Sequence, residues 1–162
     1  MDDDGRLDAA QRFLGLRRIA LVGLSRDPKG FSRAVMRELL ARGHDVVPVN
    51  PALAPGEAEG RRCLAHVGEA DPPVDGALLI TPPARTAEAV RECLAAGVRR
   101  IWMHRGAGAG SATPEAVALC RAAGVEPVTG LCPFMALPEA GWFHRAHAWL
   151  RRRELARAAP GA

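Results

Sequence analysis

Short apolar runs alternate along this chain with segments whose apolar residues recur at helical spacing. The runs show no polar alternation, which is typical of strands covered on both faces of a sheet. They lie at 19–22, 46–49, 76–80, 98–103 and 125–128. Strands that alternate with helices predict a parallel sheet with helices on both faces. We therefore expect an α/β, Rossmann-like, doubly wound fold with a five-stranded, mainly parallel sheet.

The helical segments carry recognisable start and stop signals. Three times the chain passes from a helix end through a glycine into an apolar strand, at Gly43, Gly97 and Gly124. Glycine after a helix adopts the left-handed conformation that ends it. Thr86 is a possible N-cap, and Thr113 followed by proline is a stronger one.

The length of 162 residues suits one domain with a substantial core. We expect 1–162 to form this single domain, with a helix at 1–15 and another at 140–158. The last helix is rich in aromatic residues, so it could cover the sheet edge or form a homodimer contact. The Pro- and Gly-rich segment 52–73 is predicted to be a covering loop.

A polar loop separates the first strand from the helix at 31–42. Gly23 permits a sharp turn at the strand end. Backbone N–H groups at a helix N-terminus favour an anion, and this loop adds Arg26, Lys29 and Arg33. Lys29 is the one lysine among 22 basic residues. Lys29 either contacts a ligand here or lies in this loop by chance.

Composition narrows the class of protein. No apolar run approaches the ~18 residues of a membrane span, and the acidic start lacks a secretory signal. The four cysteines form no CxxC pair, which favours a reducing, cytoplasmic setting and argues against zinc. A net charge of +4 suits a small anionic ligand. Much of this excess positive charge lies in the arginine-rich tail. We do not expect nucleic acid as a partner.

The familiar nucleotide-binding motifs are absent. A dinucleotide fingerprint needs G-x-G-x-x-G and an acid after the second strand, but Gly23 and Gly30 are too far apart and that strand ends at Asn50. No Gly-Lys-Ser/Thr loop occurs, and the chain has no tyrosine. A phosphate-bearing nucleotide of another kind is therefore expected at the strand ends.

The motifs Val22-Gly23-Leu24-Ser25, Val47-Pro48-Val49-Asn50-Pro51, Thr81-Pro82-Pro83 and Cys132-Pro133 occur in this order. Over about 16–138 the chain resembles the small, stand-alone CoA-binding domain proteins, which are similar to the N-terminal domain of the succinyl-CoA synthetase alpha subunit. The resemblance implies a Rossmann-like fold that holds coenzyme A or an acyl-CoA over the strand ends. The positions it carries over are Gly23, Leu24, Ser25, Lys29, Ser32, Asn50, Pro51, Thr81, Pro82, Pro83, Cys132 and Pro133. Arg26 and Arg33 join them because their charge suits the phosphates of the ligand.

No catalytic constellation is evident in the sequence, so we expect binding without a reaction. His104 follows a strand and could touch the ligand, while Cys132 is either a structural turn or a thiol able to form a mixed disulfide with CoA. Two other functions stay open. One is an NAD(P)-dependent oxidoreductase or epimerase, and the other is an interaction module that uses the aromatic and basic C-terminal helix.

Overall fold

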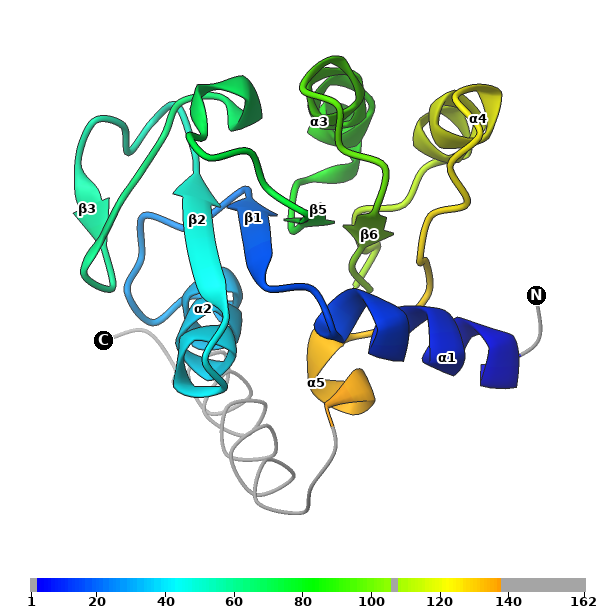
Figure 1. The fold of residues 1–162 in the computed structure, drawn as a ribbon, viewed down its shortest axis with the longest axis horizontal. Coiled ribbons are helices and arrows are strands. Elements are labelled where there is room, and N and C mark those ends of the chain that lie inside the picture. The colour runs from blue at the N-terminus through cyan, green and yellow to red at the C-terminus, as the bar shows by residue number, and fades with distance from the viewer. Residues whose placement is uncertain (1–2, 106–107, 138–162) are drawn as a thin grey trace, which may run out of the picture.

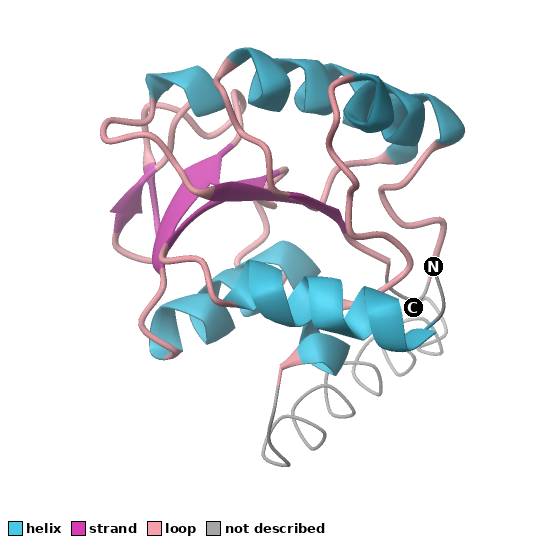
Figure 2. Ribbon diagram, turned by 45° about the vertical axis from the view of Figure 1, so that its right-hand side comes forward, coloured by secondary structure: helices cyan, strands magenta, loops and turns pink. Residues whose placement is uncertain are grey.

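The computed structural model describes residues 3–105 and 108–137. The predicted helix at 140–158 lies outside the described residues. A central sheet separates two helical layers (Figure 1). Figure 2 shows the same three layers from another side. One face is covered by α3 (Pro83–Ala95) and α4 (Pro114–Ala122), and the other by α1 (Asp3–Leu14), α2 (Phe31–Ala41) and α5 (Pro133–Ala136).

The sheet contains four parallel strands in the order β2-β1-β5-β6. This confirms the predicted α/β, doubly wound, parallel architecture. The strand count differs, since five were expected. The four strands are β1 (Arg18–Val22), β2 (Asp45–Val49), β5 (Gly76–Leu79) and β6 (Ile101–Met103).

The predicted fifth strand at 125–128 is reduced to a single bridge beside β6. The Val128 amide donates to the Ile101 carbonyl (2.9 Å), and the Met103 amide donates to the Val128 carbonyl (2.9 Å). Val128 uses both of its backbone groups in these bonds, and its pairing with β6 is an isolated bridge. The five-stranded prediction is therefore wrong by one strand.

Each strand buries both of its faces. Along β1, Ala20 and Val22 pack into the core beneath α3 and α4, while Ile19 and Leu21 pack toward α1 and α2. Neighbouring side chains of a strand point to opposite faces. Continuous apolar runs are therefore required here, which explains why the sequence shows no alternation.

The segment 52–73 has more structure than the predicted loop. It contains an antiparallel hairpin, β3 (Glu57–Ala58) and β4 (Arg61–Arg62), and a 3-10 turn, η1 (Val67–Glu69). Leu64 lies against the edge of β2, where its amide donates to the Pro48 carbonyl (3.0 Å). The segment thus covers the outer edge of the sheet.

The two helix starts proposed from the sequence have different outcomes. Thr113 caps α4, since its hydroxyl accepts the Ala116 amide at 3.1 Å. Thr86 is not a cap, because α3 begins at Pro83 and the Thr86 side chain is fully buried within the helix. Its hydroxyl serves another purpose at the site described below.

The strand order creates one place where the connections that follow two neighbouring strands run to opposite faces of the sheet. From β1 the chain crosses to β2 through α2, and from β5 it crosses to β6 through α3, on the opposite face. The loops that follow β1 and β5 therefore diverge although their strands are neighbours. Such a switch point, at the carboxyl ends of the strands, is where open α/β sheets bind ligands.

Within 3–105 and 108–137, the helices are all too short or too polar to cross a lipid bilayer.

Candidate functional site

Gly23 brings the backbone of β1 against the end of β5. Its φ is +91°, and a Cβ on this residue would lie 2.6 Å from the Ile80 carbonyl oxygen. A side chain would face both the steric clash and the unfavourable left-handed conformation. Only glycine fits this place, and so the loop can leave β1 directly at the switch point.

Two serines fold the β1–α2 loop back on the start of α2. The Ser25 amide donates to the Ser32 hydroxyl oxygen at 2.7 Å, and the Asp27 amide donates to the Ser25 hydroxyl oxygen at 3.1 Å. Gly30 allows this fold, because a Cβ there would lie 2.7 Å from the Ser25 Cβ. The predicted site positions Ser25 and Ser32 thus contact each other directly.

The loop presents positively charged side chains that form no ion pair within the described residues. Arg26 and Lys29 are exposed, and neither has an ion-pair partner within the described part of the chain. The helix they precede, α2, has no side-chain cap and no acid in its first turn. By contrast, α4 is capped by Thr113 and carries Glu115 in its first turn. The first turn of α2 therefore has no acid of its own to offset the positive end of the helix dipole, and the acid of the loop is Asp27, whose carboxylate accepts the Lys29 amide at 2.9 Å.

Arg33 is built into the scaffold of the loop. It is buried, and its Nε donates to the Ser25 carbonyl at 2.8 Å. Its Nη1 lies 3.5 Å from a Glu59 carboxylate oxygen, which also pairs with Arg37 at 2.9 Å. Arg33, which the sequence analysis predicts to bind a phosphate, is thus held by a backbone carbonyl and by an acid from the β3–β4 hairpin. Glu59 was not identified from the sequence, since it lies 26 residues away.

Asn50 joins the ends of β1 and β2. Its Nδ2 donates to the Leu24 carbonyl at 2.7 Å, and its Oδ1 accepts the Ala52 amide at 2.8 Å. A carboxylate could not donate the first of these bonds. This explains why asparagine stands here. Leu24 itself is fully buried in the core, and the neighbouring Pro51 is exposed.

The end of β5 is held by a chain of hydroxyl groups. Thr81 is buried, and its hydroxyl lies 2.7 Å from the Thr86 hydroxyl, which donates to the Pro82 carbonyl at 3.2 Å. Thr81 therefore uses its side chain to shape the turn into α3. The exposed Pro82 and Pro83 stand at the surface of this turn. They leave α3 without a side-chain cap.

A row of rings connects the start of α2 with the end of β6. Phe31 lies 5.2 Å from the His104 ring and 5.7 Å from the Phe134 ring, between centroids. His104 also contacts Ser111, with 2.9 Å between Nδ1 and the hydroxyl oxygen. Burial lowers the pKa of His104 below its usual value, and the nearby Leu79 carbonyl opposes this in part. Ser111 and Phe31 were not identified from the sequence as site residues.

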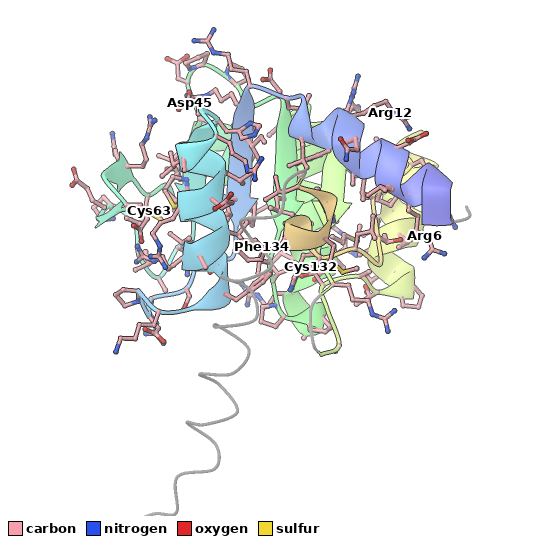
Figure 3. The ribbon with its side chains drawn as sticks, turned by 90° about the horizontal axis from the view of Figure 1, so that it is seen from below. Arg6, Arg12, Asp45, Cys63, Cys132 and Phe134 are labelled. Carbon is pink, nitrogen blue, oxygen red and sulfur yellow. The ribbon has the colours of Figure 1, made fainter. Side chains whose placement is uncertain are left out.

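Cys132 and Pro133 lie at the start of α5, beyond β6. Figure 3 shows Cys132 and Phe134 at this segment, between α2 and α4. Cys132 is half-buried, and burial raises the pKa of its thiol despite the nearby Phe134 and Met135 amides. Pro133 is buried. At neutral pH Cys132 is therefore a thiol, which is a weaker nucleophile than a thiolate.

The structure brings most of the predicted residues to one edge of the sheet. Gly23 contacts the end of β5, Asn50 contacts Leu24, and Ser25 contacts both Ser32 and Arg33. Cys132 and Pro133 lie one step further along this edge and are linked to it through the Phe134–Phe31 contact. In the two described ranges, the histidines, cysteines and acids do not assemble a metal cluster.

Comparison with known proteins places these features in a family. Residues 17–138 match the CoA binding domain. A hypothetical protein from Pyrococcus horikoshii OT3 is 28% identical with a TM-score of 0.71, and the alignment covers 84% of this chain and 89% of that one. The dinucleotide forming acetyl-coenzyme A synthetase 1 of Ca. Korarchaeum cryptofilum, solved with phosphate and ADP, is 27% identical with a TM-score of 0.63, covering 75% of this chain and 27% of the synthetase.

A third relative matches over a shorter stretch of sequence. The uncharacterized protein YneT of Bacillus subtilis (strain 168) is 37% identical over 59 residues, which make up 36% of this chain and 42% of YneT. The family match is much longer, extending from just before β1 to just beyond α5. On this ground, the chain belongs to the CoA-binding domain family.

Proposed function

We propose that this protein binds coenzyme A or an acyl-CoA at the carboxyl ends of its parallel strands and carries out no reaction of its own. The observation that carries the proposal is the β1–α2 loop. It leaves β1 at the switch point, and it presents two unpaired cations beside an uncapped helix that lacks acids in its first turn, all within the described residues. A ligand with several phosphate charges fits this combination.

The exposed residues of the proposed site offer three kinds of surface to a ligand, namely charged side chains, backbone groups and proline rings. Arg26 and Lys29 offer charged side chains to phosphate groups, because both are exposed and unpaired within the described part of the chain. The backbone at Gly23, Leu24 and Ser25 lies along the switch point. Exposed prolines give rigid apolar surface to the nucleotide without a loss of side-chain entropy. These prolines are Pro51, Pro82 and Pro83.

The remaining proposed positions support the site from behind. Ser32, Arg33, Asn50 and Thr81 all bond to backbone or side-chain groups of the site loops. We propose that they hold the loops in the binding conformation and contact the ligand little or not at all. Cys132 and Pro133 border the far end of the site, where the Cys132 thiol could face the ligand.

The alternative of an NAD(P)-dependent enzyme has less support. Such enzymes bind the ribose hydroxyls with an acid after the second strand. Here Asn50 stands at that place, and its side chain is occupied by Leu24 and Ala52. A role as an interaction module, a homodimer and a cytoplasmic location all stay predictions. The C-terminal helix on which the interaction module would depend lies outside the described residues.

Calorimetric titration tests the proposal with CoA, acetyl-CoA, NAD, NADP and ATP as separate ligands. We expect binding of CoA or acetyl-CoA in preference to the other three. Lys29→Ala should weaken CoA binding about tenfold, the size of one charge-assisted contact. Arg100→Ala is the matched control, because Arg100 is an exposed cation before β6, at the opposite edge of the sheet. Binding of NAD or NADP alone would contradict the proposal, as would an equal effect of both substitutions.

The absence of a reaction is tested separately. Acetyl-CoA incubated with the protein should be recovered unchanged at the rate of the buffer control. Loss of the acetyl group that depends on the protein, measured by chromatography, would show an enzyme.

A further inference from the structure

The hydrogen bonds around Ser111 determine which nitrogen of His104 carries the proton. The Ser111 side chain is fully buried, and its hydroxyl donates to the Thr81 carbonyl at 2.8 Å. A serine hydroxyl has one proton to give. Since the carbonyl can only accept, Ser111 must accept from His104 at its second contact, 2.9 Å from Nδ1. Nδ1 of His104 is therefore the protonated nitrogen.

The other nitrogen of the ring is left without a proton. Burial disfavours the charged imidazolium and lowers the pKa of His104. In the neutral ring only one nitrogen carries hydrogen, so Nε2 has a free lone pair. Nε2 makes no hydrogen bond within the part of the chain that the structure describes. His104 is only partly buried, so the ring is not sealed from a ligand.

The contact with Phe31 places the His104 ring at the border of the proposed site. His104 follows β6, and its ring lies against Phe31, the first residue of α2. The β1–α2 loop ends at the same helix start. A ligand that enters the loop therefore passes close to His104.

We propose that His104 is a specificity-determining residue that accepts a hydrogen bond, through Nε2, from a neutral N–H or O–H group of the ligand. An ionised phosphate oxygen is a poor partner for the neutral ring at this point, because the oxygen anion and the unprotonated nitrogen both offer lone pairs. The phosphates belong instead with Arg26 and Lys29. The inference rests on the proposed function: coenzyme A offers such donors both on its adenine and on its pantetheine arm.

The protonation state is measured first, without any ligand. Long-range proton–nitrogen NMR of the ¹⁵N-labelled chain at about pH 7.5 should show His104 with a protonated Nδ1 and an unprotonated Nε2. A proton on Nε2, or on both nitrogens, overturns the inference. Because no CoA is present, this result does not depend on the proposed function.

Two substitutions then separate the acceptor from the packing of the ring. His104→Asn keeps a donor near Nδ1 for Ser111 but has nothing at the place of Nε2, whereas His104→Gln carries an amide oxygen close to that place. We expect CoA to bind five- to tenfold more weakly to His104→Asn, the size of one neutral hydrogen bond. His104→Gln should stay within about twofold of the unsubstituted protein. Unchanged binding to His104→Asn, or an equal loss in both variants, overturns the inference.

The source of the donor is resolved with 3′-phosphoadenosine 5′-diphosphate, the nucleotide half of CoA. If His104→Asn weakens this half as much as CoA, the donor belongs to the nucleotide, as the adenine amino group or the ribose 2′-hydroxyl. If it weakens CoA alone, the donor lies on the pantetheine arm. Both results support the acceptor role. Failure of the unsubstituted protein to bind CoA would instead refute the proposed function and leave the NMR result standing. Thermal denaturation of both variants verifies that each one folds.

Discussion

Replacement of Gly23 by alanine should damage both the stability of the protein and its binding site. The residue has a φ of +91°, and a Cβ would lie 2.6 Å from the Ile80 carbonyl oxygen and 2.9 Å from its carbon. Both atoms are backbone, so no side chain can rotate away. The substitution therefore forces β1 and the residue after β5 apart at the switch point.

The magnitude follows from two separate costs. The left-handed conformation costs an alanine about 1–2 kcal/mol, and alanine recovers about 0.4–1 kcal/mol by restricting the unfolded chain. Forcing extra volume into a packed region adds about 1–3 kcal/mol. The free energy of unfolding should therefore fall by about 1–5 kcal/mol. At roughly 2–4 °C per kcal/mol, the melting temperature falls by about 2–18 °C.

Gly43→Ala is the matched control for this experiment. Gly43 has nearly the same φ, +87°, but no atom lies within 4 Å of the place that a Cβ would take. It should show the conformational cost alone, about 1 kcal/mol. Urea denaturation of both variants gives the difference directly. Equal losses would refute the argument that close backbone approach, as well as conformation, requires glycine at position 23.

Four further substitutions test the packing and electrostatics of the protein. Arg33→Met should lower the free energy of unfolding by about 2–3 kcal/mol, because it removes both the buried cation beside Glu59 and the donor to the Ser25 carbonyl, while Glu59 keeps its pair with Arg37. The substitution Arg37→Met, at an exposed residue, should cost less than about 1 kcal/mol. Equal losses of the two variants in urea denaturation would contradict this. Because the pKa of His104 is lowered by folding, the unfolded chain binds its proton more readily, so stability should fall as pH decreases below about 6.5. His104→Gln should flatten this dependence relative to the unsubstituted protein, and an unchanged slope between about pH 7.5 and 5.5 would count against it. Thr113→Ala removes the cap of α4 and should cost about 1 kcal/mol, measured by thermal denaturation.

Much of the architecture could be predicted because its causes are local. Buried strands read as continuous apolar runs, and glycine after a helix marks the passage to the next strand at Gly43, Gly97 and Gly124, all of which have positive φ. The cap at Thr113 depends only on the residues within one turn. Two predictions made from local patterns were wrong, one for a strand and one for the start of a helix. The apolar run at 125–128 forms a single bridge to β6 instead of a strand, and the helix that Thr86 was expected to begin starts three residues earlier, at Pro83.

The roles of individual site residues depended on neighbours that the sequence does not reveal. Local patterns were enough to predict the strand-and-helix alternation, the glycine turn after β1 and the cluster of cations beside it. The packing of the whole chain is needed to know that Arg33 pairs with Glu59, that Asn50 bonds to Leu24, and that Ser111 orients His104. These partners lie on different loops, which become neighbours only once the strands pack in the order β2-β1-β5-β6. Strand order follows from burial of both sheet faces by the whole chain, and no single stretch of sequence contains that information.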